Sequence, residues 1–278
     1  MKVFLSFDME GVAGVVDWSQ CRPSGGAAYE LGCALTLAEV NAAIDGAVGG
    51  GADEIVVNDA HGAMANLDPR LLHAPATYLS GRHKPGYMMQ GLDASFDAVF
   101  FVGYHGSISG EPSTLSHTYN PEFVSGVRLG DRYVGESGIN ALAAWELGVP
   151  VALVTGDAVT LEELKPIAPD CVGVVTKRSV SRFAAHHLRP ETACALIEDA
   201  ARRAVEAVAA GGIAPPRIDH PATLEVELQT ADMAEVAGWV KGVERSGTRR
   251  VRIEGGSGSE VYRAFVALTY ITRQAGGR

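Results

Sequence analysis

The 278-residue sequence predicts an α/β protein whose doubly wound, mostly parallel sheet carries helices on both faces. Short apolar runs alternate with helical patterns along most of the chain, as is typical of strands joined by crossover helices. Several of these runs stop directly at Asp, Glu or His next to Gly. A proline-rich stretch then separates two patterns, and we expect an α/β domain over residues 1–213 and a small C-terminal α+β region over residues 219–278.

The first apolar run, residues 2–7, reads as a buried strand because β-branched and aromatic residues fill it. It ends at Asp8 and Glu10, which would share one face, since side chains two apart on a strand point the same way. Two buried carboxylates this close need a positive partner, and a metal ion is the simplest candidate. Alternatively, Asp8 caps a turn and Glu10 is solvated. A long loop over residues 11–26 then leads to a helix over residues 29–48.

The same strand-end pattern occurs twice more along the chain. A run over residues 54–58 ends at Asp59 and His61, and a run over residues 96–103 ends next to His105. The carboxyl ends of parallel strands lie at one edge of a sheet, where the covering helices leave them open. The sequence therefore predicts that these side chains gather with the first carboxylate pair at that edge.

Three further polar residues follow in the next part of the chain. His117 lies in S-T-L-S-H-T-Y-N, a segment without periodicity that we interpret as a loop over the same edge. Glu136 opens an amphipathic helix that ends at Gly148, so it is either another ligand or a partner of the helix dipole. Asp157 follows a strand over residues 151–156 and is either another edge carboxylate or a helix cap.

The remaining pattern predicts elements without a ligand cluster. Residues 213–221 are a proline-rich linker, and we place the domain boundary near residue 215. His186 and His187 are expected on the flank of a helix. Because the tail lacks candidate ligands, we expect it to shape a pocket or an oligomer interface. The other expected elements are strands at residues 76–80, 171–177, 223–229 and 250–255, and helices at residues 189–210, 230–240 and 259–273.

Composition excludes several classes of protein. An apolar content of 47% is enough for a large core, and a net charge of -10 with a pI near 5.3 disfavours nucleic acid or an anionic membrane as partner. The four cysteines are scattered without a C-x-x-C spacing, which indicates neither a zinc knuckle nor a disulfide framework. No apolar run approaches the ~18 residues of a membrane span, and the N-terminus lacks a signal-peptide pattern. We expect a cytoplasmic protein.

Five side chains of the oxygen and nitrogen type would meet at the sheet edge. Such ligands suit one or two zinc ions better than manganese or iron. A carboxylate that can bridge two ions, held roughly 3.5–4 Å apart, is what a two-metal hydrolase needs. The predicted ligands are Asp8, Glu10, His61, His105 and Glu136.

Seven motifs in register extend this interpretation to a family. They are S-F-D-M-E-G, N-D-A-H-G, S-G-R-H-K-P, F-V-G-Y-H-G, L-S-H-T, V-G-E-S-G-I-N and V-T-G-D. In this order and at this spacing the sequence resembles the zinc D-aminopeptidases of the bacterial dipeptide-transport operon, from residue 1 to about 185 and more loosely to the end. The resemblance implies a zinc-dependent aminopeptidase that removes the N-terminal residue of short peptides such as D-Ala-D-Ala.

The resemblance also implies roles for single residues. One of two zinc ions per chain would be held by Asp8, Glu10 and His61, and the other by Asp8, His105 and Glu136, with Asp8 as the bridge. His117 would be the catalytic residue, described in the family as a nucleophile. Rings of five chains stacked into a decamer are implied as well.

The residues themselves leave alternatives open. His117 could attack the carbonyl carbon as a nucleophile, or it could move a proton as general base and acid. A two-metal amidase or phosphoesterase could use the same ligands, although Arg82 and Lys84 are the only basic residues near the edge motifs. The alternative without enzymatic activity is a binding module that holds an anion at Gly-rich strand ends. The preference for D over L peptides rests on the resemblance alone.

Overall fold

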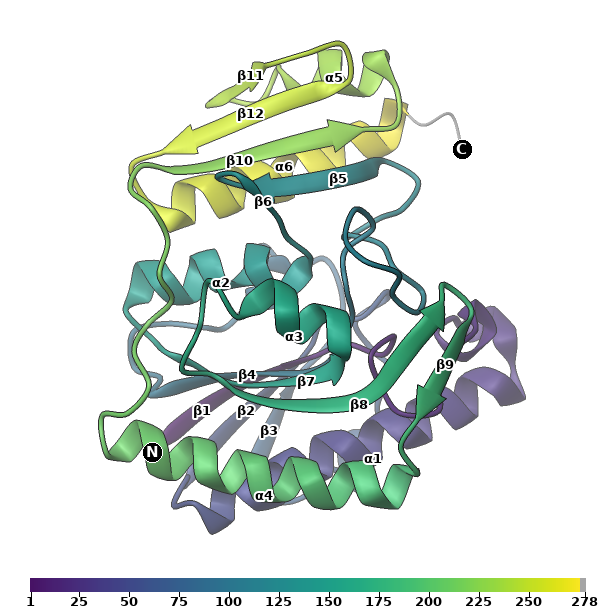
Figure 1. Ribbon diagram of the computed structural model, residues 1–278, viewed down its shortest axis with the longest axis vertical. Helices are drawn as coiled ribbons and strands as arrows, with labels where there is room; N and C mark the ends of the chain where they lie inside the picture. Colours follow the sequence, from purple (N-terminus) through teal and green to yellow (C-terminus); the bar gives the residue numbers. More distant parts are fainter. Residues whose placement is uncertain (276–278) are drawn as a thin grey trace.

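The computed structural model, which describes residues 1–275, confirms the mostly parallel α/β prediction. Its main sheet has seven strands in the order β3-β2-β1-β4-β7-β8-β9 (Figure 1). All neighbouring pairs are parallel except β8 with β9. The strands are β1 (Lys2–Phe7), β2 (Glu54–Asp59), β3 (Ala76–Leu79), β4 (Ala98–Tyr104), β7 (Val151–Asp157), β8 (Val172–Ser181) and β9 (Ala184–His187).

The winding of this sheet fixes where a ligand can bind. The chain moves to one side of β1 through β2 and β3, and to the other side through β4, β7 and β8. The direction of winding therefore reverses between β1 and β4. Open α/β sheets bind their ligands outside the carboxyl ends of the strands at such a switch point.

Helices cover both faces of the main sheet (Figure 1). On one face lie α1 (Ala27–Gly49) and α4 (Pro190–Ala209), and on the other lie α2 (Glu136–Leu147) and α3 (Ala158–Leu164). A side chain at Gly46 would collide with the backbone of α4, so this glycine allows the two long helices to approach closely. Within residues 1–275, α1 alone is long and apolar enough to pass for a membrane span, but its most apolar window is 56% buried inside the protein. We interpret α1 as a core helix.

A second, antiparallel sheet of five strands has the order β11-β12-β10-β5-β6. Strand β10 alternates buried and half-buried residues, as a sheet with one covered face requires. Helix α6 covers that face and packs against α2, so it lies between the two halves of the molecule (Figure 1). The elements are β5 (Val124–Leu129), β6 (Arg132–Tyr133), β10 (Ala222–Leu228), α5 (Ala231–Ala237), β11 (Val243–Arg245), β12 (Arg250–Gly255) and α6 (Gly258–Ala275).

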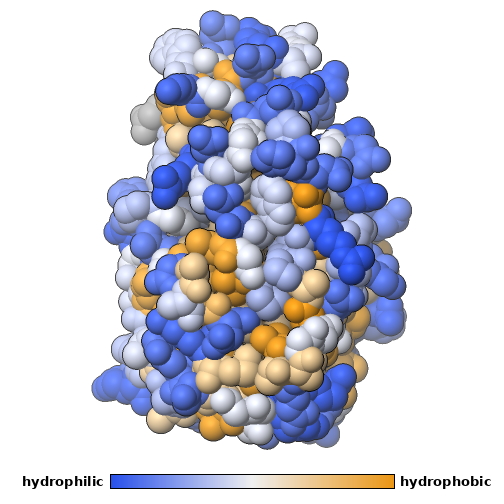
Figure 2. All heavy atoms as spheres, turned by 90° about the vertical axis from the view of Figure 1, so that its left-hand side faces the viewer, coloured by the Kyte–Doolittle hydropathy of each residue, from blue (hydrophilic) through white to orange (hydrophobic). Residues whose placement is uncertain are grey.

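The exposed side of the second sheet is strongly polar. Arg249 pairs with Glu227 at 2.7 Å, and Arg250 pairs with Glu225 at 3.3 Å. Figure 2 shows one side of the molecule, where hydrophobic residues are more abundant in the half that contains the main sheet. Four short 3-10 turns complete the described elements: η1 (Trp18–Gln20), η2 (Pro23–Gly25), η3 (Pro69–Leu71) and η4 (Tyr87–Met89).

Several details differ from the sequence-based expectations. The strands β5, β6, β9 and β11 were not predicted, and the expectation of a helix flank at His186 and His187 is wrong because both lie in β9. Asp157 acts as a helix cap: its carboxylate accepts a hydrogen bond from the Thr160 amide at 2.9 Å, at the start of α3. The division into residues 1–213 and 219–278 stays a prediction, and the second sheet takes two strands from residues 124–133.

Candidate metal centre

Asp8 and Glu10 lie beyond the end of β1 and are buried, with 2% and 1% of their surface exposed. The amide of Asp8 donates to the Val102 carbonyl oxygen at 2.8 Å, so Asp8 still follows the pairing of β1 with β4. Glu10 lies in the turn that follows rather than in the strand. The carboxylates nevertheless meet at His61, whose Nδ1 is 2.9 Å from Asp8 Oδ1 and 3.0 Å from Glu10 Oε2.

The turn after β1 depends on a glycine and a lysine. A side chain at Gly11 would collide with the Tyr104 carbonyl oxygen, so only glycine allows the turn to lie against the end of β4. Lys177 of β8 is buried and donates to the carbonyl oxygens of Glu10, Val12 and Val15. The backbone that carries Glu10 is thus fixed from two sides.

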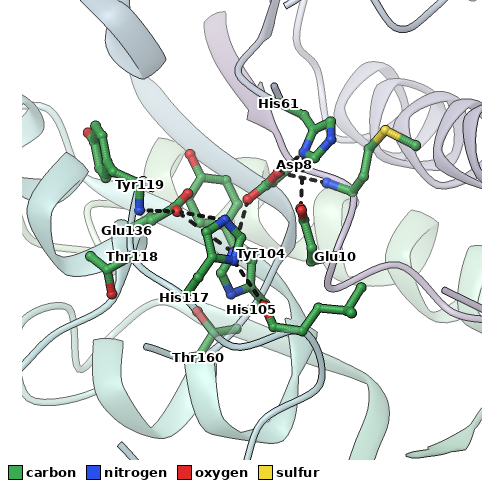
Figure 3. Close-up of polar contacts among 12 residues, drawn as sticks. Asp8, Glu10, His61, Tyr104, His105, His117, Thr118, Tyr119, Glu136 and Thr160 are labelled. Carbon is green, nitrogen blue, oxygen red and sulfur yellow. Dashed lines mark hydrogen bonds and ion pairs between the residues drawn. The ribbon is translucent and has the colours of Figure 1, made fainter. Parts of the chain in front are cut away.

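His61 follows β2, and its second ring nitrogen is fixed from outside the site. Its Nε2 lies 2.7 Å from the carbonyl oxygen of Cys21, which can only accept a hydrogen bond. The Nδ1 atom therefore faces the carboxylates (Figure 3). Asp59, the last residue of β2, holds the following turn by accepting from the Asn66 amide and from the Tyr78 hydroxyl, each at 2.6 Å.

His105 follows β4, next to β1, and is 1% exposed. Its Nδ1 lies 2.9 Å from the Gly106 carbonyl oxygen, which directs Nε2 toward the carboxylates. That Nε2 is 3.5 Å from Asp8 Oδ2 and 3.8 Å from Glu136 Oε1. Asp8 thus presents one carboxylate oxygen to His61 and the other to His105 (Figure 3).

Glu136 and His117 close the other side of the site. Glu136 lies in the first turn of α2, is 3% exposed, and accepts a hydrogen bond from the Tyr119 amide at 2.7 Å. His117 Nε2 is 3.6 Å from Glu136 Oε1, while His117 Nδ1 lies 2.9 Å from the Leu115 carbonyl oxygen. The His117 ring stacks on His105 with centroids 4.3 Å apart and meets the edge of Trp18 at 5.3 Å.

The buried carboxyl groups and histidines of the site shift one another's pKa values. Burial alone would raise the pKa of Asp8, but the nearby imidazoles of His105 and His61 outweigh it and hold that pKa well below its usual range. Burial acts to lower the pKa of His61 and His105, yet the carboxylates hold the first well above its usual range and raise the second to about 10. Burial and the charge of Asp8 raise the pKa of Glu136 to about 8, whereas burial and His105 lower the pKa of His117 to about 4.

The residues present fit a metal ion. His105 Nε2 and Glu10 Oε2 are buried without a hydrogen-bond partner within the described chain. Nδ1 of His61 lies near Glu10 Oε2, but its hydrogen bond goes to Asp8, so the Glu10 contact is an ion pair only. Ligand atoms within 4.8 Å of one another occur in three overlapping groups: Asp8, Glu10 and His105; His105, His117 and Glu136; and Glu10, Cys21 and His61.

These groups open into a cavity of about 490 Å³. Asp8, Glu10 and Glu136 line it together with His61 and His117. The fold thus brings together all six predicted site residues. Sequence reasoning missed the Cys21 carbonyl, the Tyr119 amide and Lys177, because backbone groups and distant strands leave no motif.

Buried carboxylates and imidazoles at the switch point of an α/β fold are typical of a metallohydrolase. The model of the D-aminopeptidase family, peptidase family M55, matches residues 1–267, and the chain belongs to this family. The D-aminopeptidase of Bacillus subtilis (strain 168) is 34% identical over 274 residues, which is 97% of each chain. The chain is therefore a metallo-aminopeptidase, a hydrolase.

A solved structure agrees with the family match. It is that of the Zn-dependent D-aminopeptidase DppA from Bacillus subtilis, described as a self-compartmentalizing protease. It is similar to this chain with a TM-score of 0.91 and 32% sequence identity, over 99% of this chain and 98% of that chain.

Proposed function

We propose that the protein is a two-zinc D-aminopeptidase that removes the N-terminal residue of short peptides such as D-Ala-D-Ala. The observation that carries this proposal is the position of Asp8 between His61 and His105, with one carboxylate oxygen toward each. Asp8, Glu10 and His61 would hold one zinc ion, and Asp8, His105 and Glu136 the other. Zinc is supported by the Zn-dependent relative and by the oxygen and nitrogen ligands.

When bound, the zinc ions would act as Lewis acids toward the scissile carbonyl and increase the acidity of water. The chain's own residues would do the remaining work. His117 Nδ1 donates to the Leu115 carbonyl oxygen, so Nε2 carries the lone pair and faces the cavity next to Glu136. We propose that this Nε2 takes a proton from the attacking water and passes it to the leaving amine. Trp18 and His105 hold the ring in place.

The alternative role of His117 is nucleophilic attack, which leaves an acyl group on the ring. The two roles differ in whether rapid quenching of the reaction traps a covalent acyl-enzyme adduct. A general acid and base leaves no covalent adduct, so mass spectrometry of quenched enzyme should find only the unmodified chain. An acyl adduct that is present in the parent and absent from His117→Ala would establish the nucleophile instead.

The function is tested by amine release from D-Ala-D-Ala and L-Ala-L-Ala by zinc-loaded protein. We expect cleavage of the D peptide alone, its loss with a chelator, and a kcat at least about 10²-fold lower in His117→Ala. His73→Ala is the matched control, since His73 is exposed and pairs with Asp45 away from the cavity. If neither peptide is cleaved, the substrate assignment is wrong.

A two-metal phosphoesterase or amidase remains the second candidate. Arginines 22, 82 and 273 line the cavity, and guanidinium groups can hold phosphate as well as carboxylate. Hydrolysis of a nitrophenyl phosphate without hydrolysis of either peptide would favour the phosphoesterase.

We also propose a homo-oligomer, with a decamer as the specific expectation. The self-compartmentalizing relative supports it, and so do exposed apolar side chains at Val180, Phe183 and Trp239, the last of which is 70% exposed. Sedimentation should give about ten times the 29.1 kDa of one chain, and a monomer would contradict the proposal. A cytoplasmic location stays a prediction.

A further inference from the structure

Three arginines line the cavity of the metal centre and come from separate parts of the fold. Arg22 lies in the loop after β1, Arg82 follows β3, and Arg273 lies in the last turn of α6. None of the three forms an ion pair with another residue of the described chain, whereas Arg202, Arg245 and several others do. The guanidinium groups are therefore available to an anion from solution.

Arg82 and Arg273 share a second feature that Arg22 lacks. Both also line a smaller adjoining hollow of about 50 Å³ beside Tyr87 and Tyr270. Burial raises the pKa of the Tyr270 hydroxyl, and both guanidinium charges oppose this, as expected if both lie near that side chain. Arg22 differs, because its guanidinium lies 4.9 Å over the ring of Trp18. Arg22 is therefore already in contact with Trp18, the residue that packs against His117.

Lys84 anchors the segment that carries Arg82. The ammonium group of Lys84 is buried and donates to the Asn58 side chain at 2.7 Å, the Asp59 carbonyl at 2.6 Å and the Leu79 carbonyl at 3.0 Å. These bonds tie the segment after β3 to the end of β2. The motif S-G-R-H-K-P thus has two functions, in which the lysine anchors the segment and the arginine faces the cavity.

We propose that Arg82 and Arg273 form a subsite for the C-terminal carboxylate of a short peptide. The inference rests on the proposed aminopeptidase function. Asp8, Glu10 and Glu136 line one part of the cavity. The metal ions and the free amine of a substrate would be held there. The arginines add a cationic part, so the cavity is complementary to a molecule with an amine at one end and a carboxylate at the other. Bidentate guanidinium–carboxylate bonds are strong and directional.

Two peptides with the same scissile bond test the subsite: D-Ala-D-Ala and D-Ala-D-Ala amide, which lacks only the negative charge. We expect the zinc-loaded parent to cleave the free acid with a kcat/KM at least about tenfold higher. In Arg82→Gln and Arg273→Gln this preference should fall toward unity through loss of activity on the acid alone. Arg263→Gln is the matched control, since Arg263 is exposed on α6 and outside the cavity lining.

A binding measurement separates failure of the subsite from failure of the proposed function. Calorimetric titration of zinc-loaded His117→Ala with the two peptides reports the preference without turnover. Tighter binding of the acid by at least about tenfold, lost when Arg82→Gln is added, supports the subsite even if the parent hydrolyses neither peptide. Equal binding of acid and amide, or equal loss of both in the arginine variants, overturns it.

Discussion

Glu39 is a buried carboxyl group beneath the loop that carries the metal ligands. It lies in α1, is 1% exposed, and accepts one hydrogen bond from the Ala13 amide at 2.8 Å. Its second oxygen has no partner within the described chain. Burial raises its pKa to about 7, against the opposing effects of the Ala13 amide and the charge of Lys177. The native state therefore binds this proton more tightly than the unfolded chain does.

This raised pKa predicts a specific dependence of stability on pH. Because the native pKa exceeds the ordinary value of 4.5, the contribution of Glu39 to the free energy of unfolding falls as pH rises from about 4.5 through 7. Between pH 5 and pH 8 the decline is roughly 2–3 kcal/mol, at about 1.4 kcal/mol per pKa unit. Glu39→Gln should remove this decline, so its stability relative to the parent should increase with pH in urea unfolding.

The matched control for this carboxyl group is Glu30→Gln. Glu30 lies in the first turn of the same helix but is exposed. Its stability curve against pH should run parallel to that of the parent. If Glu39→Gln also runs parallel to the parent, the carboxyl group is ionised in the native state at pH 5 and the argument from burial is wrong.

At the scale of elements, β8 stabilises the turn after β1 through Lys177. Lys177→Met keeps the aliphatic volume but removes the donor to three carbonyl oxygens, including that of Glu10. We expect a loss of about 2–4 kcal/mol in the free energy of unfolding. Zinc affinity should also fall at least about tenfold, because the change frees the backbone of a ligand. Urea unfolding and competition with a chromophoric chelator measure the two effects.

Loss of charge alone should have neither effect. Lys165→Met, at the exposed C-cap of α3, is the control for charge and should leave both values close to those of the parent. Normal zinc affinity in a destabilised Lys177→Met would show that the ligands keep their place without the lysine, and would contradict the positioning role.

Which elements could be predicted depends on how local their signals are. The strands β1, β2, β4 and β7 are apolar runs that stop at polar residues and glycine, so their ends and side chains could be located in the sequence. In contrast, β5 pairs with β10, nearly a hundred residues later, and its short pattern carries no sign of that partner. Strand β9 reads A-A-H-H and has no β-branched residue. It is a strand only because it pairs with β8.

The site shows the same division between local and distant signals. The strand-end position of Asp8, His61 and His105 predicted their meeting because parallel topology brings such ends to one edge. The contact of Lys177 with Glu10 joins residues 167 apart in the chain, and no spacing in the sequence indicates it. The sequence left open whether Glu10 shares a strand face with Asp8 or is solvated in a turn. It lies in a turn but is buried, and its carboxylate meets His61.

At the scale of the whole molecule, the cavity joins the two halves of the fold. The strand ends of the main sheet supply the metal ligands, and α6, which covers the second sheet, supplies Arg273. The C-terminal region therefore contributes to the pocket, which is one of the two roles expected for it from the sequence; the other, an oligomer interface, stays a prediction. A metal ion in this place would connect the ends of β1, β2 and β4 with the first turn of α2.

Such a connection exists only in the native state, so zinc should stabilise the entire molecule. At a free zinc concentration of about 100 Kd the gain is about 2.7 kcal/mol, which corresponds to a rise in Tm of roughly 5 °C for a chain of this size. Scanning calorimetry with zinc and with a chelator measures it. His105→Ala should fold but lose most of the shift, whereas His73→Ala, exposed beside Asp45, should keep it. An equal shift in both variants would mean that zinc binds elsewhere, because His105 Nε2 faces only this site.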